Sequence, residues 1–313
     1  MRDIRALQKA AFLQLHKLGI RFGIHILPVH YYSPVANILD LERTKRVWAR
    51  KSELPGVAVN LDEQVENLRA ICLPYQKEYL GNKIYKEGAK NLRQAYGYIE
   101  AEALHAVIRH YQPRRVIEVG GGLSTYCTLA ALRMNEQEGG GTGSMTSIEP
   151  YPSQSLQDLE EINLITDPVQ AVPLELFADL GENDFLFIDS SHAMKPGSDV
   201  NHLILEVLPR LRRGVLVHFH DIHLPYDYPR DVLENFLHFN ETSLLHAFLI
   251  FNSRIKIIFS MSQLHYERQD ALREVFPDYN PQAEVNGLRK GGHKPFASIH
   301  EHFPSSLYLQ VHY

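Results

Sequence analysis

The chain contains only two cysteines in 313 residues, Cys72 and Cys127. Two cysteines cannot build a disulfide framework, and neither lies in the C-x-x-C spacing of a metal or redox motif, so we expect two reduced core thiols. The sequence also lacks an apolar run near the ~18 residues that suggest a membrane span, and it lacks the apolar segment of a signal peptide. These absences favour a cytoplasmic protein without a transmembrane segment.

Excess positive charge is absent as well. The net charge is -5, and no block of lysine and arginine residues concentrates positive charge locally, so we expect no nucleic acid partner. Hydrophobic residues make up 44% of the chain, which is enough to build a core. The length favours one large α/β domain with an added segment.

The first 23 residues predict an amphipathic helix, because basic residues such as Arg5 and Lys9 alternate with apolar ones such as Phe12 and Leu15. We expect this helix to pack on its own domain or on a second subunit, which leaves a homo-oligomer open. Binding to a membrane surface and a transit peptide are the alternatives.

Helical spacing continues through residues 60–110, before the first predicted strand. We therefore place a loose boundary near residue 95. Residues 1–95 would form a helical N-terminal cap on the substrate side, and residues 96–313 a domain in which strands and helices alternate.

The alternation after residue 115 predicts an α/β fold with a parallel sheet. Strands are expected at 115–119, 145–148, 184–188, 214–219, 254–260 and 306–311, with helices at 124–136 and 241–252. The stretch 263–303 contains several prolines and glycines and is predicted to be rich in loops.

The most informative segment joins the first of these strands to its helix. Glu118 ends a β-branched run, and Gly120, Gly121 and Gly122 follow it, with Ser124 at the start of the predicted helix. Glycines at such a turn let the backbone bend tightly and bring its N–H groups against a ligand. The segment therefore predicts a site for a nucleotide-type cofactor.

The residues on either side of the glycines distinguish between possible cofactors. A dinucleotide fingerprint reads G-x-G-x-x-G, and here its third glycine would fall on Thr125. Glu118 would repel a pyrophosphate, whereas it would suit a ligand with an ammonium group. S-adenosylmethionine carries such a group, so we favour it over NAD.

On these residues the chain resembles the class I S-adenosylmethionine-dependent methyltransferases, whose first motif is an acid followed by G-x-G. The resemblance implies a Rossmann-like, doubly wound, mostly parallel seven-stranded sheet with an antiparallel last strand. It also implies that Glu149, at the end of the second strand, accepts hydrogen bonds from the ribose hydroxyls. The expected cofactor-binding residues are Glu118, Gly120, Gly121, Gly122, Ser124 and Glu149.

A second cluster of polar residues follows two later strands. Asp189 and His192 come after one strand, and His220 and Asp221 after the next. Ligands in open parallel sheets bind beyond the carboxyl ends of the strands, so these side chains should face one crevice. Carboxylates together with imidazoles can surround a divalent cation.

The cluster resembles that of metal-dependent O-methyltransferases that modify sugars and natural products. The resemblance implies metal ligands at Asp189, His220 and Asp221, and a general base at His192. Many relatives carry two oxygen ligands at the strand-end pair, whereas this chain has His220, which would favour manganese, iron or zinc over magnesium unless Asp221 alone binds. His218 and His223 lie close by, so the sequence leaves open which histidine faces the site.

We therefore expect an S-adenosylmethionine-dependent O-methyltransferase, assisted by a divalent metal and acting on a hydroxyl of a small molecule such as a sugar, a glycosylated natural product or a phenol. An iron-dependent hydroxylase on the same scaffold and a non-catalytic adenosylmethionine-binding protein are the alternatives. Residues expected near the acceptor are Lys195, Asp199, Asn201, the segment 224–229, Tyr31 and Tyr32.

Overall fold

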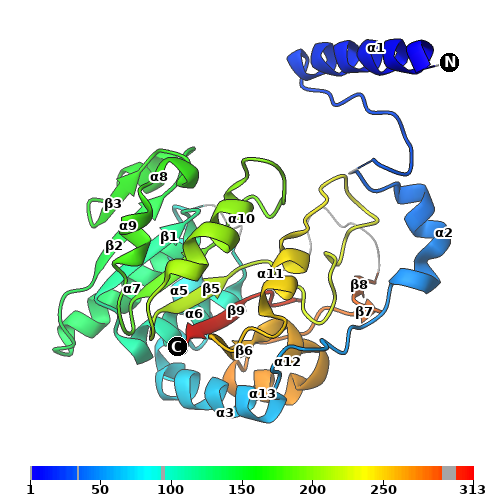
Figure 1. The fold of residues 1–313 in the computed structure, drawn as a ribbon. Coiled ribbons are helices and arrows are strands. Elements are labelled where there is room, and N and C mark those ends of the chain that lie inside the picture. The colour runs from blue at the N-terminus through cyan, green and yellow to red at the C-terminus, as the bar shows by residue number, and fades with distance from the viewer. Residues whose placement is uncertain (1, 34, 93–95, 291–300) are drawn as a thin grey trace. The chain divides into compact units, whose positions relative to one another are not determined.

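Figure 1 shows a computed structural model of the chain, which describes residues 2–33, 35–92, 96–290 and 301–313. The chain divides into two compact units, residues 1–49 and residues 50–313. The sequence placed a loose boundary near residue 95, whereas the helices between residues 61 and 111 lie in the same unit as the sheet. Their apolar faces pack against strands, as described below, so they are part of the main core.

The first unit contains two helices, α1 (Arg2–Arg21) and α2 (Ile38–Trp48). The predicted N-terminal helix is therefore present. Asn37 caps α2, since its side chain accepts hydrogen bonds from the backbone N–H groups of Leu39 and Asp40. Within this unit Phe12, Leu15 and Leu18 are exposed.

The second unit is built on a seven-stranded sheet in the order β3-β2-β1-β4-β5-β9-β6. Its strands are β1 (Arg115–Val119), β2 (Ser144–Ile148), β3 (Ile162–Ile165), β4 (Phe185–Ile188), β5 (Leu216–Phe219), β6 (Ile255–Ser260) and β9 (Leu307–Val311). β1 to β5 pair in parallel, and β9 lies antiparallel between β5 and β6 (Figure 1). A short hairpin of β7 (Glu284–Val285) and β8 (Leu288–Arg289) stands apart from this sheet.

Helices connect these strands. Those of the second unit are α3 (Leu61–Cys72), α4 (Gln76–Tyr79), α5 (Lys83–Gly88), α6 (Tyr98–Tyr111), α7 (Leu123–Gln137), α8 (Gln154–Gln157), α9 (Leu174–Ala178), α10 (Asp199–His202), α11 (Glu241–Leu249), α12 (Met261–Glu267) and α13 (Gln269–Val275). Short irregular helical turns cover Leu73–Tyr75, Val169–Ala171, Leu203–Val207 and Leu208–Arg210.

The sheet is buried on both faces, because successive residues of a strand point to opposite sides. On β1, Val116 belongs to one hydrophobic cluster and Ile117 to the other, and on β4 Phe187 and Leu186 divide in the same way. Residues of α3, α6, α7, α12 and α13 complete the first cluster, and residues of α9, α10 and α11 the second. Helices on both faces confirm the predicted doubly wound fold and its antiparallel last strand.

Two parts of the sheet domain differ from the sequence-based prediction. β3 was not predicted, and it supplies the seventh strand at the edge of the sheet. The stretch 263–303 was predicted to be rich in loops, which is wrong for its first part, where α12 ends and α13 follows. Leu264, Leu272 and Val275 are buried there, so helical spacing of apolar residues outweighs the prolines that follow. Residues 291–300 of this stretch lie outside the described residues.

Cys72 and Cys127 are both buried free thiols, as predicted. Among the residues that the structure describes, each helix is too short or too polar to cross a bilayer.

Candidate functional site

The turn after β1 requires glycine because other strands crowd it. Gly120 has a φ of +88°, and a Cβ added to it would lie 2.0 Å from the backbone oxygen of Asp189. A Cβ on Gly121 would lie 2.7 Å from Oγ of Ser147. Nothing lies within 4 Å of a Cβ built on Gly122, whose backbone is extended, so this residue faces open space.

Glu118 lies behind this turn. It is fully buried, and it accepts hydrogen bonds from the hydroxyls of Ser124 (2.8 Å), Thr125 (2.6 Å) and Ser147 (2.9 Å). Burial raises the pKa of Glu118 to about 7, although the three hydroxyls oppose that shift. The hydroxyl of Thr125 also accepts a hydrogen bond from the backbone N–H of Gly122 at 3.0 Å. Thr125 occupies the position of the third glycine of a dinucleotide fingerprint, and its hydroxyl links the glycine turn to Glu118.

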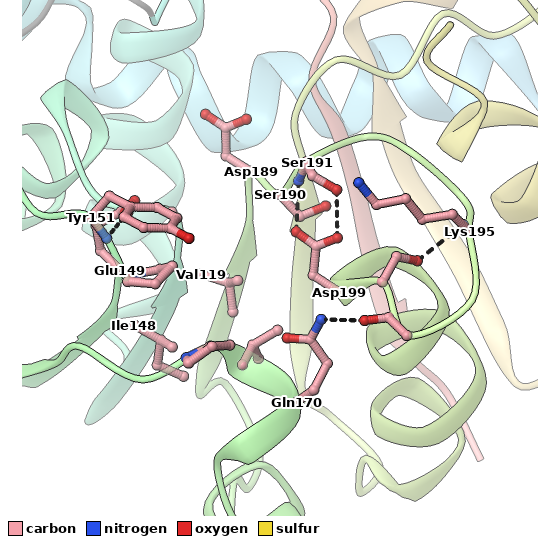
Figure 2. A pocket seen from close by; sticks show the side chains of 16 residues that line it. Val119, Ile148, Glu149, Tyr151, Gln170, Asp189, Ser190, Ser191, Lys195 and Asp199 are labelled. Atoms are coloured by element: carbon pink, nitrogen blue, oxygen red, sulfur yellow. Dashed lines mark hydrogen bonds between the residues drawn. The ribbon is translucent and has the colours of Figure 1, made fainter. Parts of the chain in front are cut away.

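Two cavities open at the carboxyl ends of the strands. The larger one, here called the strand-end cavity, measures about 380 Å³, and Figure 2 shows the residues that line it. The smaller one, the turn cavity, measures about 170 Å³ and is lined by Tyr96, Gly120, Gly121, Gly122, Leu123, Ser124, Glu149 and Asp189. Gly120, Glu149 and Asp189 line both. Five of the six predicted cofactor residues thus surround this space, and Glu118 supports it from behind.

Glu149 is held at the boundary between the two cavities. One of its carboxylate oxygens accepts a hydrogen bond from the N–H of Tyr151 at 2.8 Å, and the other from the N–H of Gly121 at 3.3 Å. Figure 2 shows the contact with Tyr151, and the two contacts together fix the carboxylate next to the glycine turn. Each oxygen still has capacity for a ligand hydroxyl, since a carboxylate oxygen can accept more than one hydrogen bond.

Residues that the sequence placed near the acceptor are distributed more widely. Lys195 and Asp199 line the strand-end cavity, where Asp199 accepts hydrogen bonds from the N–H and hydroxyl of Ser191 at 2.8 and 2.6 Å. Asn201 donates to the backbone oxygen of Lys195 at 3.1 Å and lines neither cavity. The segment 224–229 also lies outside both linings.

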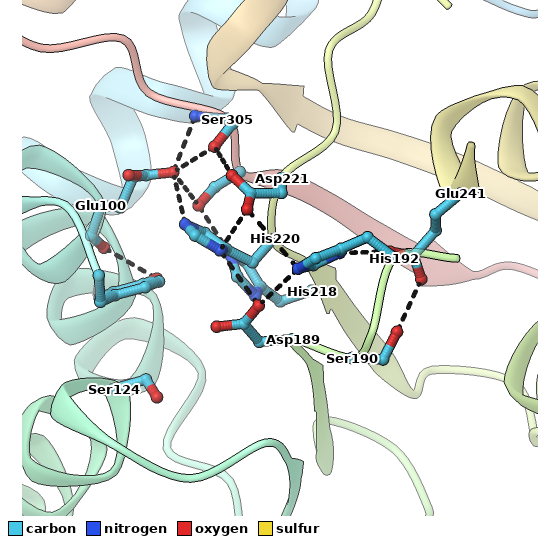
Figure 3. A network of polar contacts seen from close by, with 12 residues as sticks. Glu100, Ser124, Asp189, Ser190, His192, His218, His220, Asp221, Glu241 and Ser305 are labelled. Atoms are coloured by element: carbon cyan, nitrogen blue, oxygen red, sulfur yellow. Dashed lines mark hydrogen bonds and ion pairs between the residues drawn. The ribbon is translucent and has the colours of Figure 1, made fainter. Parts of the chain in front are cut away.

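The second predicted cluster does come together at the ends of β4 and β5, as Figure 3 shows. Nε2 of His192 lies 3.2 Å from a carboxylate oxygen of Asp189 and 3.6 Å from one of Asp221. Nδ1 of His220 lies 3.3 and 3.8 Å from the same two oxygens. Two imidazoles therefore face one pair of carboxylates.

The far nitrogen of each imidazole meets another buried carboxylate, which sequence reasoning missed. Nδ1 of His192 lies 2.7 Å from Glu241, and Nε2 of His220 lies 3.2 Å from Glu100. Glu241 and Glu100 are 1% and 2% exposed. Glu100 also accepts hydrogen bonds from the backbone and the hydroxyl of Ser305. No local motif marks either glutamate.

These contacts decide the protonation of the cluster. Burial alone would lower the pKa of His192, but its hydrogen bonds with Asp189 and Glu241 hold that pKa well above the ordinary value. The pKa of His220 is also raised, because the charges of Asp221 and Asp189 outweigh burial. Conversely, the two histidines lower the pKa of Asp189 against the effect of burial. At neutral pH both imidazoles therefore carry a positive charge in this arrangement.

The neighbouring histidines have other surroundings. His218 is fully buried, stacks on Phe187 at 4.5 Å and contacts the hydroxyl of Ser306 at 2.9 Å, and burial lowers its pKa to about 3. His223 stacks on Phe303, and burial lowers its pKa to about 4. His220 is therefore the histidine after β5 that faces the carboxylates.

The donor types fit a divalent cation, because carboxylate oxygens and imidazole nitrogens are common ligands of such ions. Their arrangement is that of ion pairs. Across the described ranges, no group of three or more histidine, cysteine, aspartate or glutamate side chains is placed to hold a metal ion. If Asp189, His220 and Asp221 bound a cation, their present ion pairs would have to break and be replaced by bonds to the metal.

Comparison with known proteins locates a family within this domain. Residues 117–222 match the model of a family described as "Methyltransferase domain", and this range contains the glycine turn, Asp189, His192, His220 and Asp221. An uncharacterized protein of Archaeoglobus fulgidus is 31% identical over 170 residues, which span 50% of this chain and 74% of that protein.

The chain also shows a low likeness to solved structures. The O-methyltransferase TomG from Streptomyces achromogenes, in complex with S-adenosylmethionine, is 15% identical with a TM-score of 0.41, over 88% of this chain and 97% of that one. An O-methyltransferase from Bacillus cereus, in complex with S-adenosylhomocysteine, is 15% identical with a TM-score of 0.39, over 62% of this chain and 90% of that one.

Proposed function

The chain belongs to the class I S-adenosylmethionine-dependent methyltransferases, and we propose that it transfers the methyl group of that cofactor to a hydroxyl of a small molecule. The observation that carries the proposal is the placement of His192 and Asp189 beside the glycine turn. Asp189 lines both cavities and lies 3.2 Å from the imidazole. An imidazole and a carboxylate that can exchange a proton thus adjoin the cofactor space.

We assign S-adenosylmethionine to the two joined cavities. Gly120, Gly121, Gly122 and Ser124 would face the methionine part, and Glu149 would accept hydrogen bonds from the ribose hydroxyls. Glu118 would act indirectly, because its oxygens bind the hydroxyls of Ser124, Thr125 and Ser147 and keep the turn in shape.

The reaction that we propose needs one proton acceptor. Nε2 of His192 takes the proton of the acceptor hydroxyl as the oxygen attacks the methyl carbon, and the carbon–sulfur bond breaks with its electron pair going to sulfur. The products are the methyl ether, neutral S-adenosylhomocysteine and an imidazolium. Most of the acceleration would come from holding the two reactants in line.

A cation is needed to make His192 available for this step. In the observed network the neighbouring carboxylates hold the pKa of His192 high, so its Nε2 carries a proton. We propose that a divalent metal bound by Asp189, His220 and Asp221 would neutralise these carboxylates. When bound, such an ion also lowers the pKa of an alcohol. The positively charged sulfonium of the cofactor would add to the same effect.

Calorimetric titration of the full chain with S-adenosylmethionine tests the cofactor, with NAD as the competing ligand. Transfer of a labelled methyl group from the cofactor to a panel of phenols and glycosides tests the reaction. Binding of NAD but not S-adenosylmethionine would reject the cofactor assignment. EDTA tests the metal separately, since unchanged binding and unchanged turnover after its addition would reject metal assistance.

A small-molecule acceptor and a cytoplasmic location are part of this proposal, and a homo-oligomer stays a prediction. The alternative of an iron-dependent hydroxylase has its own signature in the same assay. Oxygen consumption that depends on ferrous iron and proceeds without methyl transfer would favour that alternative over ours.

A further inference from the structure

We propose that Glu241 is the positioning residue of His192: it fixes the orientation and the tautomer of the imidazole so that Nε2, and not Nδ1, faces the acceptor. The inference rests on the proposed function, since it concerns the proton acceptor of that reaction. Glu241 lies outside the matched methyltransferase range of residues 117–222. No local motif in the sequence marks this residue.

The first observation is the contact itself. A carboxylate oxygen of Glu241 lies 2.7 Å from Nδ1 of His192, which is the shortest of the contacts between this imidazole and a carboxylate. Glu241 is 1% exposed, and its other oxygen accepts a hydrogen bond from the hydroxyl of Ser190 at 3.3 Å. Figure 3 shows Glu241 on the opposite side of the ring from Asp189.

The second observation is that the same helix end holds the backbone of His192. The backbone oxygen of His192 accepts hydrogen bonds from the N–H groups of Asn240 at 3.0 Å and Glu241 at 3.2 Å. His192 itself has a φ of +56°, a left-handed conformation that a non-glycine residue adopts only where its surroundings hold it. Phe239 packs against the ring at 5.1 Å with its edge. Both the ring and its backbone are therefore tied to the start of α11.

The chemical consequence concerns the two tautomers of a neutral imidazole. A carboxylate only accepts hydrogen bonds, so Glu241 stabilises the form with the proton on Nδ1. Asp189 and Asp221 favour a proton on Nε2 for the same reason in the observed network. When their charge is neutralised, as the proposed function requires, the contact with Glu241 decides the tautomer and leaves the lone pair on Nε2. The other tautomer would present a hydrogen to the acceptor and would be unable to take its proton.

Burial of a carboxylate is unfavourable, and the buried carboxylate of Glu241 lies against the proposed proton acceptor. Burial raises the pKa of Glu241, and its hydrogen bond with His192 opposes that shift. A contact needed only for packing would be served by an apolar side chain of similar size, whereas orientation of a tautomer requires an acceptor atom at this point.

The test is Glu241→Gln in the full chain, because glutamine keeps the size but can turn its amide NH₂ toward Nδ1. Proton NMR of the resting protein should show the Nδ1–H of His192, bonded to a carboxylate, as a signal far downfield of the amides. His192→Asn assigns that signal. We expect Glu241→Gln to abolish it or move it upfield. An unchanged signal would overturn the inference without any need for an acceptor.

Kinetics give the second readout where the wild type methylates a member of the phenol and glycoside panel. Glu241→Gln should lower kcat by about 10² to 10⁴, by analogy with tautomer loss in a catalytic triad, while the Kd for S-adenosylmethionine stays unchanged. Glu241→Asp, which keeps a carboxylate, should recover part of that loss. Equal losses in kcat for the two variants would contradict the inference.

Glu78→Gln is the matched control, since Glu78 lies 2.8 Å from Nε2 of the buried His105 and lines neither cavity. It should lower thermal stability without changing the His192 signal or kcat. Different results would reject the proposed function and the role of Glu241. A wild type that neither binds S-adenosylmethionine nor transfers its methyl group would reject the proposed function, whereas normal kcat in Glu241→Gln would reject only the role of Glu241.

Discussion

The backbone oxygen of Asp189 occupies the space that a Cβ on Gly120 would need. A Cβ added to Gly120 would come within 2.0 Å of that oxygen, and Gly120 also has a φ of +88°. The N–H of Asp189 donates to the backbone oxygen of Val119 at 2.9 Å. The glycine turn and the acid that ends the neighbouring strand therefore form one rigid contact, which couples the cofactor space to the histidine–carboxylate network.

We expect Gly120→Ala to disturb both parts at once. The methyl group must push β4 and Asp189 away, and the positive φ adds backbone strain, so the loss of stability should exceed 1 kcal/mol and binding of S-adenosylmethionine should be lost. Urea unfolding and calorimetry measure the two effects. Gly139→Ala is the control, since Gly139 has a φ of +84° but nothing within 4 Å of its Cβ. Similar effects of both variants would attribute the damage to φ alone.

Glu149 should contribute to cofactor affinity and little to folding. It lines both cavities and receives hydrogen bonds only from the N–H groups of Tyr151 and Gly121 among the described residues. Each hydrogen bond from a ribose hydroxyl to its charge is worth about 1.5–3 kcal/mol. Because 1.4 kcal/mol is tenfold in affinity, the loss of even one such bond in Glu149→Ala should weaken S-adenosylmethionine binding by at least roughly tenfold in calorimetry. Asp158→Ala, an exposed acid outside both linings, should bind normally.

The buried charge of Glu118 predicts a dependence of stability on pH. Its folded pKa is raised from 4.5 to about 7, so the unfolded chain releases this proton first, and the free energy of unfolding falls as pH rises from 4.5 to 7. The glutamine of Glu118→Gln cannot ionise, so the free energy of unfolding of this variant does not fall for that reason as pH rises. Between pH 4.5 and pH 8, the stability of the variant relative to wild type should rise by on the order of 3 kcal/mol. A difference that is independent of pH in urea unfolding would reject the raised pKa.

How far the sequence predicted this protein depends on whether a signal is local. The buried strand before Asp189 and the glycines at 120–122 are short patterns with a direct physical meaning, and both predicted structure correctly. The protonation state of His192 could not be predicted from the sequence. His192 looks like a neutral base in the sequence, yet the carboxylates around it hold the pKa high, because Glu241 arrives from a helix 49 positions further along the chain.

Glu100 and Glu102 show the same limit within one turn of α6. They are the same residue type, two positions apart, and both are buried. Glu100 faces the imidazoles of His220 and His302, and its contacts with them hold its pKa well below the ordinary value against the effect of burial. Glu102 forms no ion pair in the ranges that the structure describes, and burial raises its pKa to about 9.

The two glutamates should therefore respond to amidation in opposite directions. Glu100→Gln removes one of the three carboxylates that face the buried imidazolium of His220, and breaking a buried ion pair from one side typically costs about 3–5 kcal/mol. Its contribution is present above the unfolded pKa of 4.5 and is lost only as pH falls toward the folded pKa, so the deficit should be nearly the same at pH 7 and pH 5. Glu102→Gln removes a group that the fold already holds neutral at pH 7 but that ionises on unfolding, so stability should rise by on the order of 1–3 kcal/mol.

Urea unfolding of both variants at pH 7 and pH 5 measures this contrast. Each variant serves as the control for the other, because the substitution, the helix and the degree of burial are the same and the two sites differ in the polar and charged groups that face the carboxylate. A loss of similar size in both variants would mean that burial alone governs these carboxylates. The opposite signs that we expect would establish Glu100 as one of the counter-charges of His220 beside Asp189 and Asp221, and with it the ion-paired network at the ends of β4 and β5.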